Sequence, residues 1–132
     1  MKGGIMASFT VYSAEKSPGI FILFCEGSLD SNSHFILEEK VDHLLQKQPS
    51  VIVFDMQKLE YISSMGIRVL IKTTKAMKKI DGQVRYVNLK PEIKKVFDIV
   101  NVMPDQTIFT SVEELDSYLI AIQDQVKRGE IE

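Results

Sequence analysis

The sequence predicts an α/β fold in which short apolar strands alternate with amphipathic helices. Two observations support this prediction. Apolar runs rich in β-branched or aromatic residues recur at 20–25, 51–54 and 84–87, and such runs are typical of buried strands. Apolar residues between and after these runs recur at the three- and four-residue spacing of a helix face. The predicted order is β-β-α-β-α-β-α-β-α, which implies a mixed, mainly parallel sheet with flanking helices.

The first elements are two strands and a helix. Residues 9–12 and 20–25 form the strands, and Ser17-Pro18-Gly19 is a strong turn signal between them. A helix over 33–48 follows, because apolar residues recur along one face: Leu37, Val41, Leu44 and Leu45. Pro49 ends this helix because proline lacks the N–H that a helix needs.

The second half of the chain continues the alternation. The expected elements are a strand at 51–54, a loop at 55–60, a helix over 64–80, a strand at 84–87, a short helix from Pro91, a strand at 107–109 and a last helix up to 126. The helix over 64–80 is expected to bury one face and to carry a basic stripe on the other. The buried set is Ile67, Leu70, Ile71, Thr74 and Met77, and the basic set is Arg68, Lys72, Lys75 and Lys79.

Length and composition indicate one globular domain. Of 132 residues, 45% are hydrophobic and 26% are charged, which disfavours disorder. We assign 1–8 to a flexible N-terminus, 9–126 to the domain and 127–132 to a polar tail. A net charge of -2 gives no reason to expect nucleic acid as a direct partner. No apolar run is long enough to insert in a membrane, and the single cysteine, Cys25, fits a cytoplasmic location.

Two adjacent serines are the most informative polar residues. Ser63 is a natural N-cap, whose hydroxyl accepts a hydrogen bond from a backbone N–H of the following helix. Ser64 would then be the first helical residue, with its hydroxyl facing solvent, where the helix dipole favours negative charge. Ser64 is therefore a suitable phosphate acceptor. The alternative is that both serines only cap a helix.

Two carboxylates follow predicted strands. Asp30 follows the strand at 20–25 and Asp55 follows the strand at 51–54. The carboxyl ends of parallel strands form the functional edge of a sheet. We therefore expect both aspartates to lie at the same edge as Ser63 and Ser64, although each alone is more often a turn or cap residue.

The sequence offers little support for catalysis. The two histidines, His34 and His43, point in different directions on the first helix and do not form a metal site. No phosphate-binding glycine loop is present, and Ser64 lacks the glycine-flanked turn of a hydrolase nucleophile. We expect no enzyme activity, no cofactor and no metal ion.

From Phe9 to Val126 the chain resembles the STAS domain family, named for sulfate transporters and anti-sigma-factor antagonists. Gly27-Ser28-Leu29-Asp30 is similar to the family's G-x-L-D loop. Residues 53–56, followed by Tyr61-Ile62-Ser63-Ser64-Met65-Gly66, are similar to its strand, loop and D-S-[S/T/A]-G signature. Residues 82–84 and 91–100 resemble its later strand and short helix.

The resemblance implies a stand-alone anti-sigma-factor antagonist that acts by partner switching. Ser64 would be phosphorylated by a kinase-type anti-sigma factor, which binds only the dephosphorylated form, and a PP2C-type phosphatase would reset the protein. The implied partner-binding residues are Asp30, Ser63, Met65, Gly66 and Arg68. Many antagonists carry aspartate at the position of Ser63, so this chain lacks one negative charge and has a second candidate acceptor. A weak homodimer is left open.

Two other functions compete with this one. A STAS adaptor that is never phosphorylated, in a transporter-associated or stress-sensing complex, would bind its partner whatever the charge at Ser64. A domain that binds or hydrolyses a small nucleotide would bind nucleotide alone, and the lack of a phosphate loop argues against it.

Overall fold

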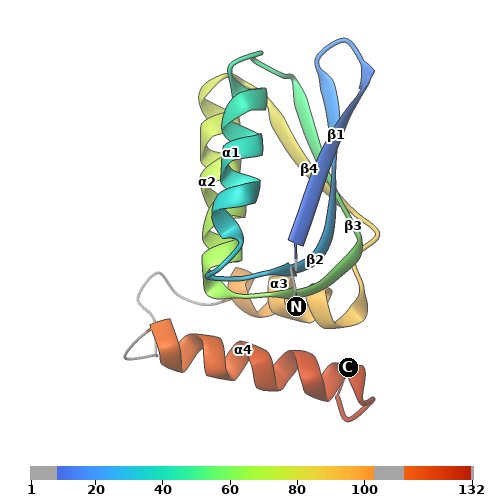
Figure 1. The fold of residues 1–132 in the computed structure, drawn as a ribbon, viewed down its shortest axis with the longest axis vertical. Helices are drawn as coiled ribbons and strands as arrows, with labels where there is room; N and C mark the ends of the chain where they lie inside the picture. The colour runs from blue at the N-terminus through green and yellow to red at the C-terminus, as the bar shows by residue number, and fades with distance from the viewer. Residues whose placement is uncertain (1–8, 103–111, 132) are drawn as a thin grey trace, which may run out of the picture.

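The computed structural model describes residues 9–102 and 112–131. Within them, the order of elements is β-β-α-β-α-β-α-α (Figure 1). The elements are β1 (Phe9–Ser17), β2 (Ile20–Leu29), α1 (His34–Leu45), β3 (Val51–Ile62), α2 (Ser64–Lys79), β4 (Gln83–Val87), α3 (Pro91–Val102) and α4 (Val112–Lys127). The predicted fifth strand at 107–109 and the predicted flexible segment at 1–8 lie outside the described residues.

The described strands form one mixed sheet in the order β1-β2-β3-β4. β1 pairs with β2 in an antiparallel hairpin, whereas β2 with β3 and β3 with β4 are parallel pairs. The α1 and α2 crossovers connect these parallel strands, so the prediction of a mixed, mainly parallel sheet is confirmed.

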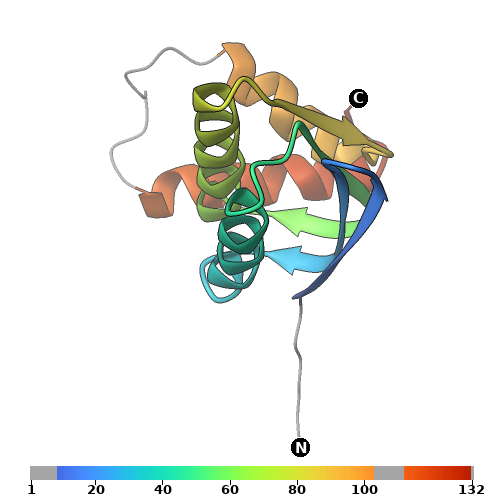
Figure 2. The ribbon, with the colours of Figure 1, turned by 90° about the horizontal axis from the view of Figure 1, so that it is seen from above.

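The core lies between the sheet and two helices. α1 and α2 run side by side along the sheet (Figure 2). Residues with little or no exposure from the sheet and from both helices form one cluster: among them Leu23, Ile52, Phe54, Leu37, Leu44, Leu70 and Met77. α3 and α4 pack on each other at the lower end of the sheet, where α2 begins (Figure 1). This end of the molecule is where the predicted site lies.

Both central strands are longer than predicted. β2 extends to Leu29 and β3 extends to Ile62, so the residues expected to form a loop at 55–60 are strand. The buried residues in this part of β3 are Met56, Leu59 and Ile62, three apart, because β3 has an extra residue relative to β2 at two points of their register. Such bulges interrupt the two-residue alternation by which a strand is recognised in a sequence.

The buried face of α2 is also turned relative to the prediction. Val69 and Thr73 are buried, whereas Ile71 is 43% exposed. Val69 and Thr73 line the same small hollow as Val41 of α1, so α2 buries a flank against its neighbouring helix as well as a face against the sheet. The predicted basic stripe is exposed, and its Lys72 forms an ion pair with Glu38 of α1.

Burial of Cys25 predicts a loss of stability at alkaline pH. Burial first, and the negative charge of Asp55 second, raise the pKa of this thiol from 9.0 to about 12. The unfolded chain therefore ionises first, so the stability due to the neutral thiol is complete below pH 9 and is lost as the pH rises toward 12. At pH 10 the wild type is expected to lose about 1.4 kcal/mol more of its unfolding free energy, relative to pH 8, than Cys25→Ala. Denaturant titrations at both pH values test this prediction, and equal losses in both proteins would contradict it.

Candidate functional site

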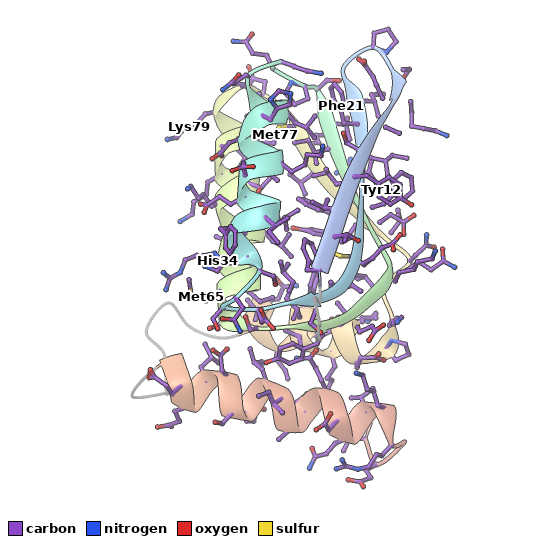
Figure 3. All side chains as sticks on the ribbon, in the orientation of Figure 1. Tyr12, Phe21, His34, Met65, Met77 and Lys79 are labelled. Atoms are coloured by element: carbon purple, nitrogen blue, oxygen red, sulfur yellow. The ribbon has the colours of Figure 1, made fainter. Side chains whose placement is uncertain are left out.

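The predicted site residues meet where β2 and β3 end and α2 begins. Leu29 and Ile62, the last residues of the two strands, are paired in register. The Ser63 N–H then donates to the Leu29 carbonyl oxygen at 2.9 Å, which joins the two chain segments that lead to Asp30 and to α2. Met65, in the first turn of α2, and His34, at the start of α1, lie at the same end of the molecule (Figure 3). The structure thus brings Asp30 and the serine pair to one edge.

Asp30 holds the loop between β2 and α1 in shape. Its carboxylate accepts the Asn32 N–H at 2.9 Å, and its own N–H donates to the Ser33 hydroxyl oxygen at 3.0 Å. That hydroxyl donates to the Ser28 carbonyl oxygen at 2.7 Å. Asp30 therefore makes turn contacts of the kind common for aspartate and is half-buried beside the start of α2.

Asp55 does not belong to this edge, and the prediction that placed it there is wrong. It lies inside β3, seven residues before Ile62, which is roughly 20 Å along a strand. Its carboxylate accepts the Gln57 N–H at 3.0 Å and the Asn88 side-chain amide at 3.2 Å. The reason is the unpredicted length of β3, since the carboxyl end of the strand is at Ile62 and not at Phe54.

The two serine hydroxyls do not act as predicted. Ser63 occupies the N-cap position with an extended backbone, but its side chain makes no capping hydrogen bond and the residue is only 3% exposed. The Ser64 hydroxyl is buried rather than exposed to solvent, and neither hydroxyl has a hydrogen-bond partner among the described residues. Both expectations, a capping Ser63 and a solvent-facing Ser64 hydroxyl, are therefore wrong.

The cap of α2 comes instead from α4. The Ser64 N–H donates to Asp116 Oδ1 at 2.8 Å, across a sequence separation of 52 residues. A carboxylate at this position satisfies an N–H that the helix cannot pair internally and is stabilised by the helix dipole. Sequence reasoning missed Asp116 because a cap from a distant helix leaves no local signal.

A second side chain of α4 fixes the end of β3. Gln123, which is 1% exposed, accepts the Ile62 N–H through Oε1 at 3.1 Å and donates from Nε2 to the Ile62 carbonyl oxygen at 2.8 Å. Asp116 and Gln123 are seven residues apart, which places them on the same face of a helix. The polar Gln123 between the buried apolar residues Leu119 and Val126 was the available signal in the sequence.

Negative charge gathers around the end of β3. Burial first, and then the charges of Asp116, Asp30 and Asp124, raise the pKa of Tyr61 to about 12. Two of these carboxylates belong to α4 and one to the loop after β2. The backbone N–H groups at the start of α2 favour an anion despite this negative charge. The anion that they hold is the Asp116 carboxylate.

The other predicted partner-binding residues differ in exposure. Arg68 is exposed and Met65 is half-buried, whereas Gly66 is buried. A Cβ on Gly66 would lie 2.8 Å from Leu29 Cγ and 2.9 Å from Ile62 Cγ1. The missing side chain of Gly66 therefore makes room for the ends of β2 and β3, and not for the approach of another molecule.

Residues 9–102 and 112–131 contain neither a metal-binding cluster nor a membrane-spanning helix. No three His, Cys, Asp or Glu side chains in these ranges lie close enough together to hold a metal ion. No helix in them is long and apolar enough to cross a bilayer.

The chain is similar to known proteins both in sequence and in structure. The STAS domain model matches residues 12–115. BtrV of Bordetella bronchiseptica, whose name marks it as a candidate anti-sigma factor antagonist, is 31% identical over 85 residues, which cover 64% of this chain and 73% of BtrV. Two solved structures of SpoIIAA have the same fold. The unphosphorylated anti-sigma factor antagonist gives a TM-score of 0.64 at 16% identity over 93% of this chain and 100% of that chain. The phosphorylated form, a Bacillus cell fate determinant, gives 0.60 at 16% identity over 70% and 85% of the two chains.

Proposed function

The chain belongs to the STAS domain family, and on that premise we propose that it is an anti-sigma-factor antagonist that acts by partner switching. The dephosphorylated protein binds a kinase-type anti-sigma factor and releases the client of that factor. The kinase then phosphorylates Ser64, which ends the binding, and a PP2C-type phosphatase removes the phosphate. The similarity to BtrV and to unphosphorylated SpoIIAA, both named as anti-sigma factor antagonists, supports the coarser part of this proposal.

The observation that carries the proposal is the position of Ser64 in the first turn of α2. The first N–H groups of a helix are unpaired and point toward an anion placed at its start. A phosphate on Ser64 would add about -1.5 to -2 charges at pH 7, at the end of the helix that best tolerates them. The domain itself should therefore remain folded after modification.

The partner would pack over the same edge. Arg68 and Met65 offer accessible side chains there; the arginine supplies a charge-assisted donor and the methionine an adaptable apolar contact. Asp30 adds a carboxylate from the neighbouring loop, while the buried Ser63 and Gly66 set the position of the first turn. Phosphate at Ser64 would block such an interface because a charge would be buried without a partner.

Binding of the partner should depend on the charge at Ser64. In pull-downs from the native host, we expect tagged wild type and Ser64→Ala to recover a kinase-type regulator, identified by mass spectrometry. Ser64→Glu is expected to recover at least tenfold less of it, since burying one unpaired charge reduces affinity by about this factor or more. Ser17→Glu is the matched control, because Ser17 is exposed at the β1–β2 turn, at the opposite end of the domain (Figure 1).

Two outcomes would contradict the proposal. Equal recovery of the same kinase-type regulator by wild type and Ser64→Glu would mean that charge at Ser64 does not control binding. Recovery of a transporter or scaffold protein by all four forms alike would favour the adaptor that is never phosphorylated.

A further inference from the structure

α4 closes the end of the domain at which Ser64 lies. It crosses below the sheet and below the first turn of α2 (Figure 1), and two of its side chains bind backbone groups there. Asp116 accepts the Ser64 N–H at 2.8 Å, and Gln123 binds both backbone groups of Ile62. These bonds join α4 to positions 52 and 61 residues earlier in the chain. We call α4 with these two contacts the strap.

We propose that the strap and a phosphate on Ser64 compete for the same site, so that docking of α4 and phosphorylation exclude each other. The Asp116 carboxylate occupies the anion position at the start of α2, which is the position that the phosphate would take. This inference rests on Ser64 being the acceptor in the proposed function. It adds that a part of the chain itself covers the acceptor and is displaced when the acceptor is modified.

Charge repulsion is the first reason for the exclusion. Asp116 and Asp124 of the strap and Asp30 of the adjacent loop all act on Tyr61, two residues before Ser63. A phosphate on Ser64 would bring up to two further negative charges into this group. Asp116 is bonded to the backbone of Ser64 itself, so the strongest repulsion falls on the bond that docks the strap.

Burial of the serine hydroxyls is the second reason. With the strap docked, both hydroxyls are buried and have no hydrogen-bond partner among the described residues. Buried, unpaired polar groups are unfavourable, so the docked state carries a penalty that release of the strap would remove by admitting water. The Ser64 oxygen also has no room for a phosphate while it stays buried. A kinase must therefore act on the strap-released form, and the phosphate then prevents the strap from returning.

Hydrogen exchange of the Ile62 amide reports directly on the strap. In the docked state its N–H is bonded to the buried Gln123 side chain. By NMR on the whole chain, Ser64→Glu is expected to raise the exchange rate of Ile62 at least tenfold relative to that of Ile52, a fully buried residue near the start of β3, at the other end of the strand. Ser117→Glu is the matched control, because it adds the same charge next to Asp116 on an exposed position of α4, and it should leave the ratio of the two rates unchanged.

Asp116→Ala provides a second, independent test. It removes the carboxylate that docks the strap and should itself raise the Ile62 to Ile52 ratio. In the Asp116→Ala background, Ser64→Glu should then add less than a twofold further increase, because the contact that it disrupts is already absent.

The results separate this inference from the proposed function. An unchanged ratio in Ser64→Glu, or equal acceleration of Ile62 and Ile52, would overturn the strap, since neither is local release of α4. Full tenfold increases by Ser64→Glu both with and without Asp116 would also overturn it. None of these measurements requires a partner protein. The exchange data can therefore overturn the strap while the pull-down supports partner switching, and they can support the strap while the pull-down contradicts partner switching.

Discussion

Truncating Phe54 to alanine is expected to lower the free energy of unfolding by about 3–5 kcal/mol. Phe54 lies in the first half of β3 with 0% exposure, and its ring stacks on Tyr86 of β4 with the centroids 5.5 Å apart. Its removal would leave a cavity between the sheet and the helices that the rigid surroundings fill only in part. Because domains of this size are stable by only about 5–15 kcal/mol, the variant should be close to the limit of folding.

Tyr12→Ala is the matched control for Phe54→Ala. Tyr12 is also an aromatic strand residue in a stacked pair, with Phe24 at 4.8 Å, but it is 50% exposed. Its truncation should lower the unfolding free energy by less than about 1.5 kcal/mol, because little apolar area is newly exposed and only the ring contact is lost. Urea titrations of the three proteins test this comparison, and equal losses in both variants would show that burial of Phe54 does not determine its contribution.

Replacing Gly66 by alanine is expected to destabilise the fold by about 1–3 kcal/mol. The new methyl group would lie 2.8 Å from Leu29 Cγ and 2.9 Å from Ile62 Cγ1, closer than carbon atoms pack. Both neighbours are fully buried at the ends of their strands, so they have little freedom to move. Alanine also gains up to about 1 kcal/mol in helix propensity, which offsets only part of the overpacking.

A double-mutant cycle identifies the cause. Leu29→Ala removes the nearest colliding atom, so Gly66→Ala should be less harmful in that background than in the wild type, as measured by denaturant unfolding. Additive effects of the two substitutions would mean that Leu29 is not the neighbour that excludes a side chain at Gly66. The cycle also prevents a misreading, because a loss of partner binding in Gly66→Ala would otherwise be taken as loss of a contact.

The sequence predicted the fold better where the local pattern was regular. Leu37, Val41 and Leu44 repeat at helical spacing and are buried in α1, and Pro49 follows the end of that helix. The second half of β3 was missed because bulges place its buried residues three apart, a spacing that does not indicate a strand. The position of Asp55 was wrong for the same reason, since β3 ends at Ile62 and not at Phe54, and a misplaced strand end also misplaces the functional edge.

The candidate site was only partly predictable. The start of α2 at Ser64 followed from helix periodicity, and the meeting of Asp30 with the serine pair followed from parallel pairing of their strands. The cap from Asp116 depends on how α4 docks, and the burial of both hydroxyls is likewise a tertiary property. A residue 52 positions away can replace a local N-cap without altering the local pattern that predicts one.

The distant cap also fixes the order in which the site is made during translation. Asp116 follows Ser64 by 52 residues, and ribosomes add about 5–20 residues per second. Each new chain therefore carries its serine pair for roughly 3–10 s before the carboxylate that caps α2 has been synthesised. In a nascent chain Ser64 therefore precedes the residue that caps its helix, so the age of the polypeptide determines whether the start of α2 can be capped by Asp116.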